Sequence, residues 1–153
     1  MRALSLVVVD ASDLILGRLA SHVAKMLLNG NRVVVVNAEK AVISGSKQNI
    51  VEEYKEYVLS KRRLKNPTKG PKKVRRPDLL VKRAIRGMLP YKKARGREAY
   101  KRLRVYVGVP EEFAEHPKIR FEDAEASRLA LKRYMYVGEL SSLFSHGPSQ
   151  GSA

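Results

Sequence analysis

The chain has 153 residues with 31 Lys and Arg against 15 Asp and Glu, which gives a formal net charge of +16. A hydrophobic fraction of 44% in a chain of this length supports one globular domain with a buried core and excludes a disordered polyelectrolyte. The absence of cysteine excludes disulfides and thiolate metal sites. The sequence also lacks an apolar run of about 18 residues, the length that a membrane-spanning helix needs.

The start of the chain predicts a βαβ unit followed by a third short strand. Residues 4–9 form an apolar run that is too short for a secretory signal and typical of a strand buried on both faces. Apolar residues at helical spacing from Leu16 to Leu27 predict a helix that ends near Gly30. A second β-branched run at 32–36 then predicts a parallel strand, and 41–43 predicts a third strand.

A nucleotide-dependent or RNA-modifying enzyme is the alternative that the βαβ unit leaves open. A dinucleotide site needs GxGxxG after the first strand, whereas residues 9–17 contain one glycine, Gly17, and place bulky side chains at 14–16. We therefore expect Gly17 to let the helix approach the sheet closely. The three histidines are isolated in the sequence, and the acidic residues between 111 and 125 are expected to form a solvated face. We predict no catalytic residue, no metal and no cofactor.

Residues 61–104, called the basic block from here on, carry nearly all of the excess charge. They contain 19 basic and two acidic residues, a net charge of +17, whereas residues 1–60 have +1 and residues 105–153 have −2. Because unpaired charge of this density cannot be buried, the block predicts an exposed surface for a polyanion. Ten of the cations are arginines, which bind phosphate in a bidentate manner, so we favour nucleic acid. A solvated face, an anionic membrane and packaged DNA are the weaker alternatives.

Loops and helices are expected to alternate within the basic block. Nine basic residues and three prolines at 61–77 predict an extended loop. An apolar stripe that includes Val81 and Ile85 predicts a helix over 78–89 with one buried and one cationic side. The pattern then predicts a second cationic loop, a short helix and a strand over residues 91–97, 98–102 and 103–107.

Outside the basic block the pattern predicts three more helices and a tail. A helix over 50–60 leads into the block. Apolar residues within 121–134 and 137–144 predict helical segments after the block. Residues 145–153 are rich in Ser, Gly and Pro, which predicts a flexible tail.

The basic block favours recognition of phosphates and shape. The sequence has no RRM signature, helix-turn-helix, zinc finger or GXXG loop to read bases. Tyr91 and Tyr100 lie among the cations, where their rings either stack on unpaired bases or are partly buried. We predict that nucleic acid contacts the following side chains: Lys61, Arg62, Arg63, Lys65, Asn66, Lys69, Lys72, Lys73, Arg75, Arg76, Lys82, Arg83, Arg86, Tyr91, Lys92, Lys93, Arg95, Arg97 and Arg102.

Seven short motifs follow one another between residues 10 and 110. They are Asp-Ala at 10–11, LGRLAS at 16–21, VNAEK at 36–40, Ser-Gly at 44–45, NPTKGP at 66–71, RGMLP at 86–90 and LRVYVGVP at 103–110. Together they resemble the large-subunit ribosomal protein thirteen family in its archaeal and eukaryotic branch. The resemblance weakens after residue 110, where a variable extension is expected.

The resemblance implies a fold, a role and a set of partners. The fold would be a three-layer α/β/α domain over residues 1–144 around a mostly parallel four-stranded sheet, with long basic loops, a C-terminal helical extension from residue 111 and a flexible tail at 145–153. The role would be structural and non-enzymatic: to bind large-subunit ribosomal RNA through the basic block and to support subunit assembly and translation. The partners would be that RNA and neighbouring large-subunit ribosomal proteins in the cytoplasm, with no membrane and no small-molecule substrate.

Overall fold

A computed structural model of the chain describes residues 5–56, 76–129 and 133–145. The elements in chain order are β1 (Leu6–Asp10), α1 (Leu16–Leu28), β2 (Arg32–Val36), η1 (Ala38–Lys40), β3 (Val42–Ser44), α2 (Lys47–Lys55), α3 (Pro77–Gly87), α4 (Ala94–Lys101), β4 (Leu103–Val105), η3 (Glu111–Phe113), β5 (Lys118–Ile119), η4 (Glu122–Ala124), η5 (Ala126–Arg128), β6 (Tyr134–Tyr136) and α5 (Val137–Ser145), where η marks a 3-10 helix. Most of the predicted extended loop at 61–77 and of the predicted tail lies outside the described residues.

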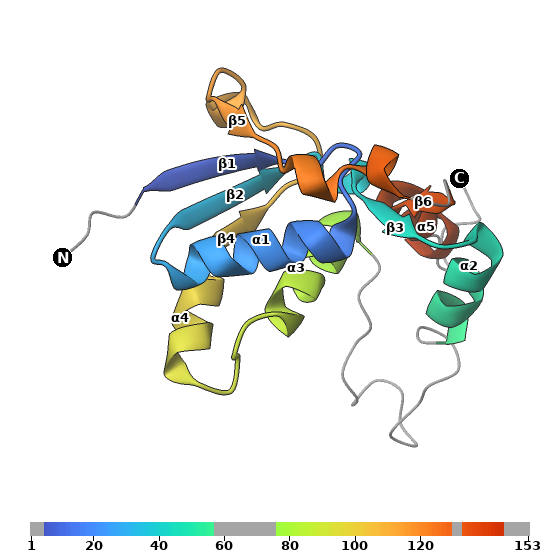
Figure 1. Cartoon of the computed structure of the whole chain (residues 1–153), viewed down its shortest axis with the longest axis horizontal. Coiled ribbons are helices and arrows are strands. Elements are labelled where there is room, and N and C mark those ends of the chain that lie inside the picture. The colour runs from blue at the N-terminus through green and yellow to red at the C-terminus, as the bar shows by residue number, and fades with distance from the viewer. Residues whose placement is uncertain (1–4, 57–75, 130–132, 146–153) are drawn as a thin grey trace, which may run out of the picture.

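Four parallel strands form the central sheet in the order β4-β2-β1-β5. β1 and β2 pair along their whole length, from Leu6 opposite Arg32 to Asp10 opposite Val36. Runs of valine make these strands because β-branched side chains suit a pleated surface that is buried on both faces. Figure 1 shows β1, β2 and β4 side by side, with α1 alongside them. The predicted α/β fold with a mostly parallel four-stranded sheet is confirmed.

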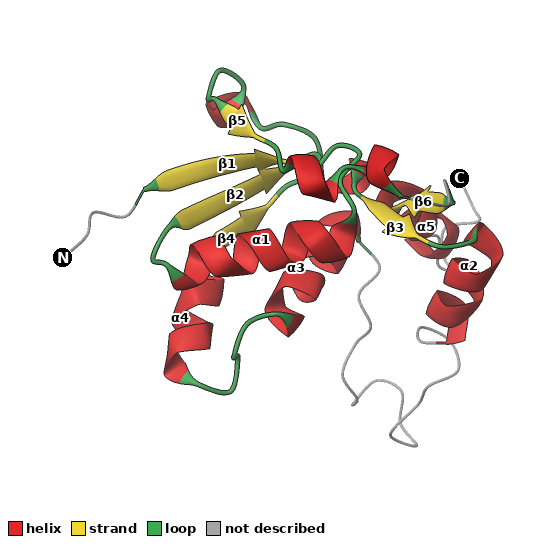
Figure 2. Ribbon diagram, viewed as in Figure 1, coloured by secondary structure: helices red, strands yellow, loops and turns green. Residues whose placement is uncertain are grey.

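Alternate residues of β1 and β2 enter two different apolar clusters. Val9 and Val35 belong to the main core, to which α1, α3 and α4 contribute buried residues. Figure 2 shows these three helices on one side of the strands. Val8 and Val34 point to the opposite face, where Phe113 of η3 packs against them. The period of two along each strand therefore buries both faces of the sheet.

β3 and β6 form a separate antiparallel pair beside the central sheet. The predicted strand at 41–43 is present as β3, but it does not belong to the central sheet. The fourth strand of the central sheet is β5. The main-chain N–H of Val42 donates to the carbonyl of Leu14 at 2.9 Å, which holds β3 beside the turn before α1 and away from β1 and β2. β5 has only two residues, and the sequence pattern predicts no strand there.

The helix predicted over 121–134 is wrong. The stretch contains the 3-10 helices η4 and η5 and then the start of β6. The main chain at Ala124 and Ala126 bonds to Ile15 and Asp13 at the beginning of α1, at 2.7 and 2.9 Å. These long-range hydrogen bonds replace the local ones that a helix would make. The helices expected at 78–89 and 137–144 are present as α3 and α5.

α4 begins at Ala94, four residues before the helix predicted at 98–102, and Gly96 explains why. A Cβ built on Gly96 would overlap the carbonyl of Pro90 and lie 2.9 Å from the main-chain nitrogen of Tyr91. The first turn of α4 is therefore packed directly on the preceding loop, and only glycine leaves room for this contact. By contrast, Gly17 has nothing within 4 Å of its Cβ position, so the close approach expected there is wrong.

We predict that Gly96→Ala destabilises the protein, whereas Gly17→Ala does not. The new methyl group meets main-chain atoms that cannot rotate away, and overpacking of this kind costs roughly 1–3 kcal/mol. Gly17→Ala is the matched control because it adds the same methyl group to a helix with free space around it, for an expected gain of about 0.5–1 kcal/mol. Chemical denaturation of both variants measures the difference. Equal stability of the two variants would contradict the packing of α4 on Pro90.

Candidate nucleic-acid interface

α3 presents the middle of the basic block on one side and packs into the core on the other. Pro77 occupies its first turn, where a missing N–H costs nothing, and Asp78 follows it at the positive end of the helix dipole. Val81, Ile85 and, just past the helix, Leu89 are buried at a spacing of four residues. This stripe lies in the main core with residues of α1 and β4, and the opposite side of α3, which includes Arg83, faces solvent.

Two aromatic rings hold cationic side chains of α3 in defined positions. The guanidinium carbon of Arg86 lies 4.0 Å from the centre of the Tyr91 ring, and the ammonium of Lys82 lies 5.1 Å from that of Tyr100. The two rings meet edge to face, with centres 5.5 Å apart. Such cation–π contacts are worth about 0.5–1 kcal/mol at exposed sites. Arg83, between Lys82 and Arg86 in the sequence, is exposed.

The loop between α3 and α4 is fixed by short hydrogen bonds. Tyr91 N–H donates to the carbonyl of Leu89 at 2.8 Å, and Lys93 N–H donates to that of Pro90 at 2.9 Å. The guanidinium of Arg97 donates to the carbonyl of Lys92 at 3.1 Å. The side chains of Tyr91, Lys92 and Lys93 are exposed. The predicted cationic loop is therefore a short, ordered turn that projects its charges outward.

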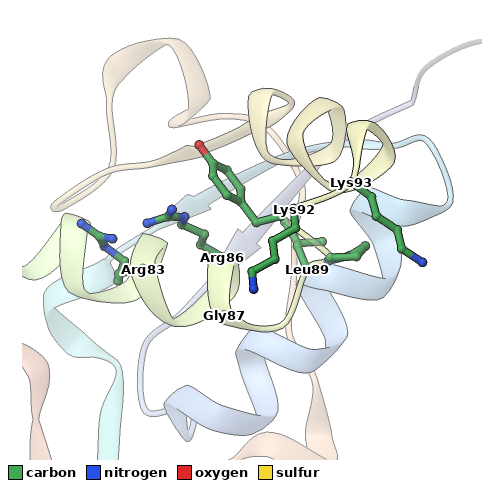
Figure 3. A pocket seen from close by; sticks show the side chains of 8 residues that line it. Arg83, Arg86, Gly87, Leu89, Lys92 and Lys93 are labelled. Atoms are coloured by element: carbon green, nitrogen blue, oxygen red, sulfur yellow. The ribbon is translucent and has the colours of Figure 1, made fainter.

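A hollow of about 580 Å³ opens between α3 and this turn, and it is called the α3 hollow from here on. Figure 3 shows the side chains of Arg83, Arg86, Leu89, Lys92 and Lys93 around it. The hollow is lined by Arg83, Arg86, Gly87, Leu89, Pro90, Tyr91, Lys92 and Lys93. Four of these eight residues are cations and none is acidic, so the hollow suits an anionic ligand.

The structure brings most of the described members of the predicted site to the surface. The exposed members are Arg76, Arg83, Tyr91, Lys92, Lys93, Arg95 and Arg97. Half-buried members are Lys82, Arg86 and Arg102. The remaining predicted contacts, from Lys61 to Arg75, lie outside the described residues. Tyr100 is half-buried and packs against the main core, so of the two tyrosines Tyr91 is the more accessible.

Two further members of the predicted site, Arg102 and Arg76, also have partners within the chain. Arg102 donates to the carbonyl of Leu27 at 2.6 Å and so satisfies the end of α1, and its Nε is buried without a partner. Arg76 forms an ion pair with Asp78 at 3.0 Å. This is the one ion pair in the described part of the basic block. The role of Arg102 in nucleic-acid binding stays a prediction, and its contact shows that it also supports the fold.

Comparison with known proteins agrees with the motifs. The sequence profile of the family described as Ribosomal protein L13 matches residues 5–112. Large ribosomal subunit protein uL13 of Methanococcoides burtonii is 52% identical over 134 residues, which cover 88% of this chain and 94% of that protein. Its counterpart in Sulfurisphaera tokodaii is 50% identical over 139 residues, covering 90% and 93%.

The chain belongs to the ribosomal protein L13 family. The resemblance drawn from the seven motifs is thereby confirmed. In this L13-family chain, several motif residues support the junction between β2 and β4. Asn37 has a left-handed backbone with φ of 58°, as does Gly108 with φ of 71°. The Gly108 N–H donates to the carboxylate of Glu39 at 2.9 Å, so residues of two motifs bond directly.

A second hollow contains a residue that sequence reasoning missed. It has a volume of about 320 Å³ and is lined in part by Lys25, Asn29, Met88 and Arg95. Lys25 lies in the nearly neutral first 60 residues, so local charge density gives no signal for it. The signal that was available is the spacing of four between Ser21, Lys25 and Asn29, which places polar groups on one side of α1.

His22 is not isolated, contrary to the expectation from its sequence neighbours. Its ring stacks on Phe121, with centres 4.4 Å apart, and its Nε2 lies 2.8 Å from a carboxylate oxygen of Asp123. The hydrogen bond with His22 lowers the pKa of Asp123 below its ordinary value. This contact ties η4 to α1. In the described parts of the chain, no three His, Cys, Asp or Glu residues lie close enough to hold a metal ion.

The C-terminal edge of the sheet, where open α/β folds bind ligands, is filled by groups of the chain itself. Ile15 N–H, at the beginning of α1, donates to the carbonyl of Ala124 at 2.7 Å. A guanidinium nitrogen of Arg120 lies 3.5 Å from the carboxylate of Asp10, which also accepts a hydrogen bond from Asn37 at 3.1 Å. Partial burial alone would raise the pKa of Asp10, but hydrogen bonds and Arg120 lower it overall. The position that would bind a dinucleotide phosphate is covered.

No described helix is both long and apolar enough to cross a membrane.

The small sheet is bound to the turn that follows β1. Tyr136 of β6 donates a hydrogen bond from its hydroxyl to the carboxylate of Asp13 at 2.6 Å. This hydrogen bond, together with partial burial and the negative charge of Asp13, raises the pKa of Tyr136 to about 12. The bond joins the small sheet to the turn before α1.

We predict that Tyr136 titrates with a pKa of about 12 and that Tyr136→Phe removes this titration step. A raised pKa means that the neutral phenol is favoured in the folded state. The resulting stability is fully present below the ordinary pKa of 10 and is lost as the pH rises towards 12. The ultraviolet absorbance of tyrosinate follows the titration. Denaturation at several alkaline pH values should show a steeper loss of stability in the wild type than in the Phe variant.

Asp13→Asn is the companion variant for this titration. Asp13 has a left-handed backbone with φ of 57°, which Asn tolerates as well as Asp does, so the turn should keep its shape. Without the carboxylate, the pKa of Tyr136 should return towards 10. A late titration that survives both substitutions would show that another tyrosine is responsible.

Proposed function

We propose that the chain is a structural, non-enzymatic component of the large ribosomal subunit that binds large-subunit ribosomal RNA. The observation that carries the proposal is the ordered cationic surface of α3 and the following turn, in a chain of the L13 family. Relatives that are about half identical to it over most of their length are named large ribosomal subunit proteins. The same proposal gives it a role in subunit assembly and translation, in the cytoplasm, with neighbouring ribosomal proteins as further partners.

Recognition would act through phosphates and the shape of the RNA. Cations displace condensed counterions from the RNA backbone, which supplies affinity without reading bases. Arg83, Lys92 and Lys93 are exposed around the α3 hollow, and Arg95 and Arg97 continue the charge along α4. Residues 61–75 contribute eight more basic residues to the proposed contacts. The domain of residues 1–144 would hold these charges in place, with α3 anchored through its apolar stripe.

The filled edge of the sheet supports a structural role over the enzymatic alternative. Ala124 covers the beginning of α1, and the bulky residues at 14–16 are largely buried. His22 is half-buried and its partner Asp123 is exposed, and neither residue lines either of the two hollows beside the basic block. Positive charge is the dominant chemical property of the described surface. A polyanion is the ligand that this charge selects.

We predict that affinity for large-subunit ribosomal RNA falls steeply with salt and that Lys92→Gln/Lys93→Gln reduces this dependence. Each lost phosphate contact should lower the slope of log affinity against log salt by roughly 0.7–0.9. Filter binding across a salt series, with deproteinised large-subunit RNA from Methanococcoides burtonii and excess transfer RNA as competitor, gives the slopes. Both side chains are exposed, so thermal unfolding should be unchanged.

Arg32→Gln/Lys40→Gln is the charge-matched control. Both residues are exposed cations outside the basic block, so the double variant removes the same net charge from another part of the surface. It should bind RNA with nearly the wild-type slope. A control that loses as much affinity as the Lys92/Lys93 variant would mean that net charge alone drives binding. Wild-type binding that is insensitive to salt would refute phosphate recognition altogether.

A further inference from the structure

The walls of the α3 hollow differ from those of a simple phosphate site. Leu89 is buried at 6% exposure, and together with Pro90 and the ring of Tyr91 it gives the hollow mostly apolar walls. The charged ends of Arg83 and Lys92 belong to flexible side chains from α3 and from the following turn (Figure 3). A phosphate needs donors and gains nothing from carbon-lined walls, whereas a nucleobase needs such walls.

Arg86 and Tyr91 already form a stack at the hollow. The planar guanidinium lies 4.0 Å from the ring centre, and both residues line the cavity. Tyr91 is 38% exposed although it is a large ring, and its edge-to-face contact with Tyr100 helps to fix its orientation. Arginine planes and tyrosine rings are the surfaces on which proteins stack unpaired RNA bases. Because the pair is formed before binding, little side-chain entropy remains to be lost.

The size and charge of the hollow fit one nucleotide. Its volume of about 580 Å³ falls within the range of roughly 300–1,000 Å³ typical of small-ligand sites. None of the described residues that line it is acidic, and the exposed Lys92 and Lys93 supply positive charge for the phosphates that flank a bound base. A free nucleotide is less favoured because the chain has no glycine-rich phosphate loop.

We propose that the α3 hollow receives the base of one unpaired RNA nucleotide, which stacks against the Arg86–Tyr91 pair while adjacent phosphates contact Arg83, Lys92 and Lys93. The proposal rests on the proposed function, because the RNA is the one that the basic block would bind. It adds a stacking contact to recognition by charge and shape. Since the walls carry few polar groups, the hollow selects for an unpaired base of any identity, with large purines stacking best.

Three variants separate stacking from charge. Tyr91→Phe keeps the ring, Tyr91→Leu keeps an apolar side chain without a ring, and Arg86→Lys keeps the charge without a plane. Affinity for deproteinised large-subunit RNA of Methanococcoides burtonii is measured over a salt series for each full-length variant. Tyr91→Leu should bind about 5- to 140-fold more weakly than wild type, with an unchanged salt slope. Arg86→Lys should also weaken binding at constant slope, and Tyr91→Phe should bind like the wild type.

Crosslinking of the wild-type chain gives an independent readout. Short-wave ultraviolet light joins stacked bases directly to aromatic side chains, and trypsin cuts on both sides of residues 87–92, which contain Tyr91. We expect the crosslink in this peptide, on a nucleotide that chemical probing of the free RNA shows to be unpaired. Thermal unfolding of each variant confirms that the fold is retained.

The outcomes distinguish this inference from the proposed function. Tyr91→Leu binding within twofold of wild type, or a crosslinked nucleotide that is base-paired, would overturn the stacking site and leave salt-dependent RNA binding standing. Weaker binding of Tyr91→Leu with a reduced salt slope would also overturn it, because the loss would then be one of phosphate contacts. Absence of salt-dependent binding by the wild type would overturn the proposed function and the stacking site together.

Discussion

Burial of the apolar stripe of α3 is the constraint on which the cationic surface depends. Val81, Ile85 and Leu89 are each at most 6% exposed and belong to the same core as α1 and β4. Burying a side chain of this size contributes roughly 1.5–3 kcal/mol. The helix cannot rotate about its axis without exposing them, so the directions in which Arg83 and Arg86 project are set by hydrophobic packing. The charges themselves repel one another and could not hold this arrangement.

Favourable contacts with aromatic rings and main-chain carbonyls partly offset the electrostatic repulsion between neighbouring cations of the basic block. Arg86 lies over Tyr91, Lys82 lies over Tyr100, and Arg97 donates to the carbonyl of Lys92. None of these partners is a carboxylate, so the positive potential outside the surface is preserved. A surface neutralised by ion pairs would be more stable in isolation but would attract a polyanion less. The contacts also fix side chains that would otherwise lose rotamer freedom on binding.

The sequence was sufficient to predict a strand or helix where the local residue pattern agrees with the tertiary packing. The valine runs of β1 and β2 and the stripe of α3 have a period that matches the final packing, so their elements are predictable. β5 and the stretch at 121–134 are not, because their conformation is set by hydrogen bonds to residues about 110 positions away, such as Ile15 to Ala124. The early beginning of α4 depends on contact with Pro90, and Lys25 reaches the second hollow only through folding. Linear charge density locates the basic block but says nothing about which cations support the fold, as Arg102 does.

Many nucleotide-binding enzymes use an open parallel sheet and bind their ligand at the carboxyl ends of the strands, but in this chain that position is filled by the chain's own residues. In open parallel sheets the beginning of the first helix faces the crevice beyond the strands and binds phosphate there. In this chain that crevice is occupied by the turn through Ala124, by the pairing of Arg120 with Asp10, and by the hydrogen bond between Tyr136 and Asp13. Positive charge is gathered instead on the helices beside the sheet. A sheet edge admits one small ligand in a crevice, whereas a helix and its flanking turns present charge over a broader exposed surface. An extended RNA backbone needs the second kind of surface, so closing the crevice removes no contact that a polyanion would use.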